Sequence, residues 1–289
     1  MSAMDAMDAM DAMDAMGKMP AMEARTGRAR VCVLIAFLFV FLLLIIARTA
    51  TVSHSAASGG AAAVEAGRPP ETVVLLHGLF RTARSMAAME RALAAAGFEV
   101  VNVGYPSLEQ PIELHARTVG EILAACCDDG RTVHFVTHSM GGIIARYYLG
   151  SAPAGLRGRV VMLSPPNQGS EVIDVLAASG LLGRAAGPSA TQLETGSNGL
   201  PARLGPVRFE LGVIAGDRTI NPLFSWLIPG DDDGAVSVES ARVEGMADFI
   251  VLPYTHTFIM NAGEVHRQTV HFLRDGRFDH GAAIEAAGD

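Results

Sequence analysis

Short apolar runs alternate with amphipathic stretches along residues 71–275, and this alternation predicts the fold. Strand-like runs, rich in Val, Ile and Leu, occupy residues 72–76, 98–103, 133–138, 160–163, 209–217 and 249–254. Helix-like patterns occupy residues 83–96, 112–126, 143–149 and 261–273. Continuously apolar strands that alternate with helices are typical of a mostly parallel sheet covered by helices on both faces. The pattern predicts an α/β domain over 71–275, followed by a tail over 276–289.

One stretch of this domain breaks the alternation. Between Pro165 and Pro206 the chain is rich in Gly, Ser and Pro, with short apolar runs such as Val172–Leu182. An insertion over the strand ends is expected here. It could cover a substrate, or its apolar residues could serve ordinary packing.

The first 70 residues have a different pattern. Residues 1–30 combine four copies of Asp-Ala-Met with several arginines and are expected to form a low-complexity basic tail. Residues 31–47 are an uninterrupted apolar run, close to the lower limit for a membrane-spanning helix. The arginines that precede this run favour a cytoplasmic N-terminus. We expect a signal anchor, or alternatively the apolar core of a cleaved signal peptide.

Residues 48–70, rich in Ala, Ser and Gly, are expected to form a flexible linker. An anchor would leave the α/β domain outside the cytoplasmic membrane, in the periplasm, and cleavage would release it as a secreted protein. Both interpretations place the domain beyond the membrane.

Charge and cysteine content exclude other classes. The chain has 289 residues and a formal net charge of −8, and it shows no basic patch that could neutralise phosphates, so no nucleic-acid partner is expected. Of the three cysteines, Cys32 lies in the apolar run, and Cys126 and Cys127 are neighbours, which rarely bridge. No Cys/His cluster has metal-ligand spacing, so neither a metal nor another cofactor is expected.

The candidate chemistry begins at Thr137-His138-Ser139-Met140-Gly141. A serine stands between a buried strand and a helix, within a tight turn of small residues. This is the layout of a nucleophile elbow, in which the strained serine backbone presents its hydroxyl at the top of the sheet. A serine hydroxyl needs a base to take its proton, so a histidine and an acid must accompany it.

His256 is the preferred base, because it lies on the loop directly after the last predicted strand. His266 and His271 are competitors, but both fall within the closing helix, where a histidine is more often a surface or packing residue.

The acid has three candidates. Asp217 ends the strand-like run 209–217, and Asp233 lies in an Asp-Gly turn 23 positions before His256. Asp233 is preferred, with Asp217 and Asp232 kept as alternatives. A cluster of aspartates before a glycine can also be a solvated surface turn.

Oxyanion donors are expected from two backbone amides. His77-Gly78-Leu79 follows the first predicted strand, and the N–H of Leu79 would pair with the N–H of Met140. His77 itself is expected to hold the loop.

Together these motifs resemble the α/β-hydrolase fold, and within it the bacterial triacylglycerol lipase and esterase group. The resemblance covers residues 71–275. Two features depart from it: Thr137 replaces the first glycine of Gly-x-Ser-x-Gly, and Phe258 stands where calcium-dependent relatives carry an acidic ligand. We therefore expect no structural calcium, and the chain has no suitable cysteines for the disulfide that such relatives also carry.

The resemblance implies a serine esterase or lipase that acts on an ester or lipid substrate through Ser139, His256 and Asp233. A thioesterase, an amidase or a lipid acyltransferase would use the same acyl-enzyme. A non-catalytic, membrane-anchored binding module on an inherited fold is the competing interpretation.

Overall fold

The computed structural model describes residues 71–127, 130–151, 158–178, 187–220 and 222–281. Its described strands form one sheet of six, in the order β2-β1-β3-β4-β5-β6, and every neighbouring pair is parallel. The strands are β1 (Thr72–Leu76), β2 (Glu99–Val103), β3 (Val133–His138), β4 (Val160–Leu163), β5 (Leu211–Gly216) and β6 (Asp248–Leu252). The central strands β1, β4 and β5 are buried along their whole length, which explains their uninterrupted apolar sequences.

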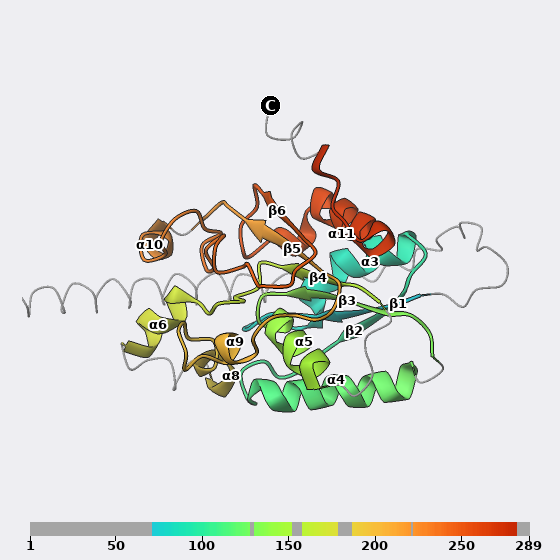
Figure 1. The fold of residues 1–289 in the computed structure, drawn as a ribbon, viewed down its shortest axis with the longest axis horizontal. Coiled ribbons are helices and arrows are strands. Elements are labelled where there is room, and N and C mark those ends of the chain that lie inside the picture. The colour runs from blue at the N-terminus through green and yellow to red at the C-terminus, as the bar shows by residue number, and fades with distance from the viewer. Residues whose placement is uncertain (1–70, 128–129, 152–157, 179–186, 221, 282–289) are drawn as a thin grey trace, which may run out of the picture. The chain divides into compact units, whose positions relative to one another are not determined.

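Helices cover both faces of the sheet (Figure 1). On one face lie α3 (Ala87–Ala95) and α11 (Gly263–Asp275), which contact each other. On the other face α4 (Ile112–Cys126) packs on α5 (Met140–Ser151), and α5 contacts β1 and β3. This arrangement confirms the predicted α/β-hydrolase architecture of a parallel sheet between helical layers.

Most predicted elements lie where the pattern placed them. Strand β1, helix α4 and strand β4 have the predicted bounds. The predicted helix over 83–96 is divided into the 3₁₀ turn η1 (Ala83–Met86) and α3, and a second 3₁₀ turn, η2 (Ile259–Asn261), precedes α11.

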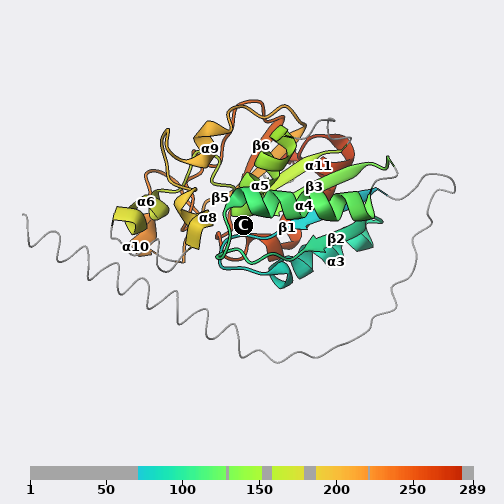
Figure 2. The ribbon, with the colours of Figure 1, turned by 90° about the horizontal axis from the view of Figure 1, so that it is seen from below.

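Four short helices gather at the carboxyl end of the strands (Figures 1 and 2). They are α6 (Glu171–Ala178), α8 (Gly187–Thr191), α9 (Leu200–Arg203) and α10 (Pro222–Ser225). The first three belong to the insertion between Pro165 and Pro206, and α10 belongs to the excursion between β5 and β6.

Buried Arg146 of α5 ties this insertion to the domain. Its guanidinium donates to the carbonyl of Asn167 at 2.9 Å, to the carbonyl of Pro201 at 3.1 Å and to the carbonyl of Gly205 at 2.7 Å. Burial lowers the pKa of Arg146 to about 10. The cation therefore serves as a multiple hydrogen-bond donor inside the protein.

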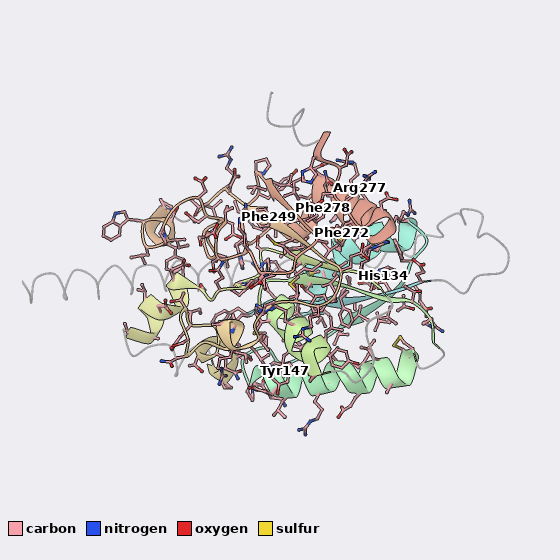
Figure 3. All side chains as sticks on the ribbon, in the orientation of Figure 1. His134, Tyr147, Phe249, Phe272, Arg277 and Phe278 are labelled. Carbon is pink, nitrogen blue, oxygen red and sulfur yellow. A yellow bond between two sulfur atoms is a disulfide. The ribbon has the colours of Figure 1, made fainter. Side chains whose placement is uncertain are left out.

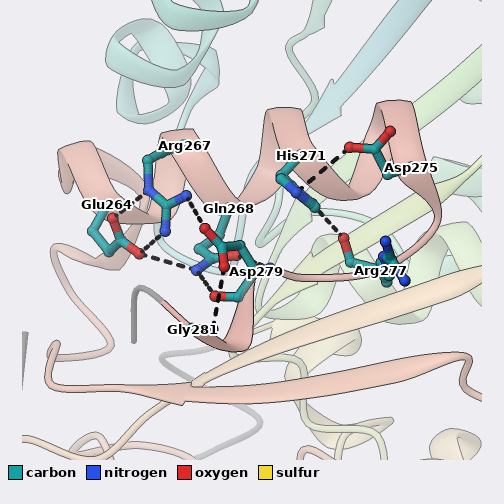
Figure 4. Close-up of polar contacts among 8 residues, drawn as sticks. All are labelled: Glu264, Arg267, Gln268, His271, Asp275, Arg277, Asp279 and Gly281. Carbon is teal, nitrogen blue, oxygen red and sulfur yellow. Dashed lines mark hydrogen bonds and ion pairs between the residues drawn. The ribbon is translucent and has the colours of Figure 1, made fainter. Parts of the chain in front are cut away.

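Packing continues beyond the expected domain end at residue 275. The rings of Phe272 and Phe278 pack at a tilt of 37° with centroids 4.9 Å apart, on the side of the sheet that α11 covers (Figure 3). Arg267 of α11 pairs with Glu264 at 2.7 Å and with Asp279 at 2.9 Å (Figure 4). These contacts hold the segment after α11 against the helix.

The structure joins Cys126 and Cys127 by a disulfide, so the expectation that these neighbours stay unbridged was wrong. Cys127 leaves the helical conformation at the end of α4, with φ −139° and ψ 24°, and the change of direction lets the two sulfurs meet.

No helix in the described part of the chain is long and apolar enough to cross a membrane. The predicted anchor at 31–47 lies outside the described residues.

Candidate active site

Ser139 occupies the turn between β3 and α5, where the sequence predicted a nucleophile elbow. Its backbone is left-handed, with φ 52°, a conformation that costs an ordinary residue about 1–2 kcal/mol. Two hydrogen bonds hold the turn: the Ser139 N–H donates to the Leu163 carbonyl, and the Gly142 N–H donates to the Ser139 carbonyl, each at 2.9 Å. The serine backbone is therefore held between β4 and the first turn of α5.

The glycines after the serine are required by close packing. A Cβ at position 141 would lie 2.5 Å from the carbonyl oxygen of Leu76, so only glycine lets α5 start this close to the end of β1. A Cβ at position 142 would lie 3.3 Å from Oγ1 of Thr137. The same Cβ would lie 3.1 Å from Sδ of Met162 and from Cβ of Pro165, so Gly142 eases the packing of three neighbours, one of which is the threonine of the elbow.

The structure brings together the three side chains that the sequence singled out. Nε2 of His256 lies 3.0 Å from Oγ of Ser139, and Nδ1 of His256 lies 2.8 Å from Oδ2 of Asp233. With Nδ1–H donating to the carboxylate, Nε2 is left to accept the serine proton. The His256 N–H also donates to the Asp233 carbonyl at 2.9 Å, so backbone and side chain fix the pair together.

Asp233 is almost fully buried, and its second carboxylate oxygen is also used. Oδ1 accepts the N–H groups of Ala235 at 3.1 Å and Val236 at 2.9 Å. These bonds leave Oδ2 aimed at His256. The side chain of Asp233 is 1% exposed and that of His256 17%, so the histidine is partly accessible to solvent and the acid lies buried behind it.

The other candidates lie in different surroundings. Asp217 is partly exposed beside Arg218, and Asp232 accepts the Gly234 N–H at 2.7 Å and contacts the Ser225 hydroxyl. His266 bonds to the Met260 carbonyl, and His271 bonds to the Arg277 carbonyl near the end of α11 (Figure 4). None of these contacts includes Ser139 or His256.

The loop after β1 passes directly over the serine. A Cβ at position 78 would lie 3.0 Å from Cβ of Ser139, so the expected oxyanion loop is adjacent to the nucleophile candidate. Met140 begins α5, and the N–H groups of a first helical turn have no acceptor within their own helix. The Leu79 and Met140 amides thus belong to the two segments that flank Ser139.

His77 holds this loop. Its Nδ1–H donates to the Gly78 carbonyl at 3.0 Å, its ring stacks on Tyr105 at 4.0 Å, and the Tyr105 hydroxyl donates to the His77 carbonyl. Burial lowers the pKa of His77 below the usual value. These contacts are those of a neutral, structural histidine.

Two further residues at this site received no role from the sequence pattern. His138 immediately precedes the serine, and its Nε2–H donates to the His256 carbonyl at 2.9 Å. Arg81 follows the Gly78 loop, and its guanidinium donates to the Thr257 carbonyl at 3.4 Å. His138 stands inside the elbow motif, which was the only signal in the sequence that could have marked it.

A parallel sheet with a strained serine after β3, and a histidine and a buried acid on later loops, defines an α/β protein with a hydrolase-type site. A family model described as "Alpha/beta hydrolase family" matches residues 73–270. The chain belongs to the alpha/beta hydrolase family. No curated protein matches the sequence.

Solved structures with the same fold include three bacterial or metagenomic enzymes. The propeptide form of the Bacillus licheniformis lipase BlEst2 has a TM-score of 0.56 at 19% identity, covering 70% of this chain and 50% of the lipase. The phospholipase PlaB from Legionella pneumophila has a TM-score of 0.56 at 19% identity, covering 75% and 58%. The metagenomic carboxyl esterase MGS0156 has a TM-score of 0.54 at 18% identity, covering 72% and 71%. The chain thus spans half the length of the first and somewhat more of the others.

Proposed function

We propose that this protein is a serine carboxylic-ester hydrolase, an esterase or lipase. The observation that carries the proposal is the continuous path from the buried Asp233 through His256 to Ser139, with contacts of 2.8 and 3.0 Å. This order of acid, base and nucleophile is the requirement for activating a serine hydroxyl.

The proposed reaction has two halves. In the first, Oγ of Ser139 bonds to the ester carbonyl carbon while Nε2 of His256 takes the hydroxyl proton. The carbon–oxygen bond to the alcohol then breaks, His256 returns the proton to the leaving alcohol, and an acyl-enzyme remains. In the second, His256 takes a proton from water, whose oxygen bonds to the acyl carbon. The bond from that carbon to Oγ of Ser139 then breaks, His256 returns the proton to Oγ, and the carboxylic acid is released. Asp233 stabilises the imidazolium in each half, and the Leu79 and Met140 amides stabilise the oxyanion.

Exposed apolar side chains favour an apolar acyl group. Six large hydrophobic side chains are exposed in the described part of the chain, and four of them lie in the loops that carry Leu79, Asp233 and His256. They are Phe80, Ile220, Trp226 and Phe258. Phe80 follows Leu79, Phe258 is two residues after His256, and Ile220 and Trp226 lie in the excursion that leads to Asp233. Exposed apolar side chains on the segments that carry the proposed catalytic groups suit a fatty or aromatic acyl chain better than a charged one.

The structural neighbours add support at the level of chemistry. A lipase, a phospholipase and a carboxyl esterase all cleave esters, and ester hydrolysis is the activity that their names share. Thioesterase, amidase and lipid acyltransferase activities use the same acyl-enzyme and are the alternatives among enzymes. A binding module without activity does not require a buried acid bonded to His256, so the Asp233–His256 contact favours an enzyme.

The test is hydrolysis of p-nitrophenyl esters of increasing chain length by the full chain, compared with Ser139→Ala. The variant should lose several orders of magnitude in rate, about 10⁴-fold or more, because it lacks the nucleophile. Ser164→Ala is the matched control, since Ser164 is also a buried serine with a left-handed backbone at a strand end, with φ 46°. A folded Ser139→Ala protein that keeps more than about one per cent of the activity would contradict the proposal.

A further inference from the structure

The imidazole of His138, at the end of β3, lies between the loop that carries His256 and the loop that carries Gly78. Its Nε2–H donates to the backbone carbonyl of His256 at 2.9 Å, and the two imidazole rings lie 4.9 Å apart. On its other side, a Cβ at position 78 would lie 2.9 Å from Nδ1 of His138. The residue before the nucleophile thus contacts both the loop of the base and the loop of the oxyanion donors.

The loop of His256 is also held at its next residue. Arg81 reaches across from the loop after β1 and donates to the Thr257 carbonyl at 3.4 Å, a long and therefore weaker hydrogen bond. The side chains of His138 and Arg81 thus bind two consecutive carbonyls of the loop that carries His256. These bonds are separate from the Asp233–His256 contact.

We propose that His138 is a positioning residue for the general base: its Nε2–H fixes the backbone of His256 relative to Ser139, and Arg81 assists at Thr257. The inference rests on the proposed function, because it assigns His138 a role only through His256. The separation of 118 positions between His138 and His256 means that this bond joins two distant parts of the chain at the point where their side chains must meet.

The surroundings of His138 suit this role. Its ring is 2% exposed, and charged or titratable groups face it from His256, Arg81 and His77. Burial, followed by the neighbouring His256 and Arg81, keeps the pKa of His138 well below its usual value, so the ring stays neutral. A neutral ring places no second positive charge beside the imidazolium that His256 becomes during the reaction.

The consequence concerns kcat more than KM. Without this hydrogen bond, the His256 loop keeps its contacts with Asp233 but loses the contact that fixes its distance from Ser139. A displacement on the order of 1 Å between base and nucleophile can cost about 100-fold in rate. His138 does not contact an acyl group in the proposed reaction, so KM should stay near its original value.

Two variants separate positioning from simple filling of space. His138→Phe keeps a planar ring without the donor, and we expect kcat to fall about 10- to 100-fold with little change in KM. His138→Gln offers an amide N–H at nearly the reach of Nε2 and should recover most of kcat. Should the phenylalanine variant fail to fold, His138→Asn replaces it, because its shorter amide cannot reach the His256 carbonyl.

His134→Phe is the matched control. His134 is likewise buried on β3, but its Nε2 pairs with Glu71 at 3.1 Å at the opposite end of the strand. This control should lower the melting temperature and leave kcat unchanged. The proposal is overturned if folded His138→Phe keeps more than about half of kcat, or if the Gln variant loses as much as the Phe or Asn variant.

A second measurement asks whether His138 acts through His256. In a His256→Ala background, adding His138→Phe should change the small residual rate by less than about twofold, because the group that His138 positions is gone. A full additional loss would assign His138 another role. If Ser139→Ala is as active as the unchanged protein, the proposed function fails. If Ser139→Ala is inactive and His138→Phe is not impaired, only this inference fails.

Discussion

Replacement of Asp233 by asparagine tests the site most directly, because the residue is buried and the change preserves its shape. Oδ1 of an asparagine could still accept the Ala235 and Val236 N–H groups, so the turn should keep its structure. What is lost is the negative charge 2.8 Å from Nδ1 of His256. In addition, the new amide would donate toward Nδ1 and favour the tautomer with its proton on Nε2, which cannot accept from Ser139.

The expected magnitude follows from the contact. Opposite unit charges about 4 Å apart, in a medium of effective dielectric constant about 20, attract by about 4 kcal/mol. Since 1.36 kcal/mol is a tenfold change in rate, loss of the charge should lower kcat about 10³-fold. The unfavourable tautomer adds to this loss, and an Asp-to-Asn change in the serine-protease triad costs about 10⁴.

The assay is steady-state hydrolysis of a p-nitrophenyl ester, with thermal melting to verify folding. Asp232→Asn is the matched control, since Asp232 is also buried, in the same turn, and bonds to Ser225 and Gly234 instead of His256. It should lower stability while sparing kcat, and Asp217→Asn at the partly exposed ion pair should change little. The reasoning is refuted if either control is more damaging to kcat than Asp233→Asn, or if folded Asp233→Asn keeps about a tenth of the rate.

Four other outcomes are expected. The pKa values of His77, His115, His134 and His138 are lowered by burial, so the unfolded chain binds more protons in acid. The histidine contribution to the melting temperature should be constant above about pH 7.5, where unfolded histidines are neutral, and be lost as pH falls through about 6.5, less steeply in His115→Leu. Arg146→Met should cost roughly 3–5 kcal/mol in urea unfolding, because it leaves buried carbonyls of the 165–206 insertion without their donor. Dialysis against EDTA should leave activity and melting temperature unchanged; loss of both, restored by calcium, would contradict this. A C-terminally tagged chain should fractionate with washed membranes at full length and be digested by protease added from outside, whereas a shortened soluble band would indicate cleavage after residue 47.

The fold was predictable because each central strand is buried on both faces. Such strands are apolar at nearly every position. The sequences of β1 and β4 can therefore be recognised as strands without knowing which strands pair with them. The limits of β5 were less sharp: the predicted run 209–217 shortened to Leu211–Gly216. The Asp217 N–H still bonds to the carbonyl of Leu252, the last residue of β6, at 3.3 Å, although the strand itself ends at Gly216.

The site was predictable where chemistry follows directly from a strand end. Ser139 and His256 lie immediately beyond β3 and a few residues beyond β6, so their approach follows from a parallel sheet. Choosing the acid required more, because a 16-residue excursion (217–232) separates β5 from Asp233. Within that turn, Asp232 and Asp233 point to different partners, and nothing in the local pattern distinguishes them. The Cys126–Cys127 bond was missed although the end of α4 was predicted, because neighbouring cysteines rarely bridge and the bond depends on the non-helical backbone of Cys127.

The threonine of the elbow is a departure from the motif, and the residue just after the motif provides space beside it. The first position of Gly-x-Ser-x-Gly is small because the following helix passes close to it, and Thr137 brings a branched side chain there. In this protein the first turn of α5 has a glycine, Gly142, beside the threonine. A Cβ at that position would lie 3.3 Å from Oγ1 of Thr137 and 3.1 Å from Sδ of Met162. The absence of a side chain at position 142 therefore contributes to the space around Thr137. A side chain at position 142 would require Thr137, Met162 and Pro165 to shift by a few tenths of an ångström.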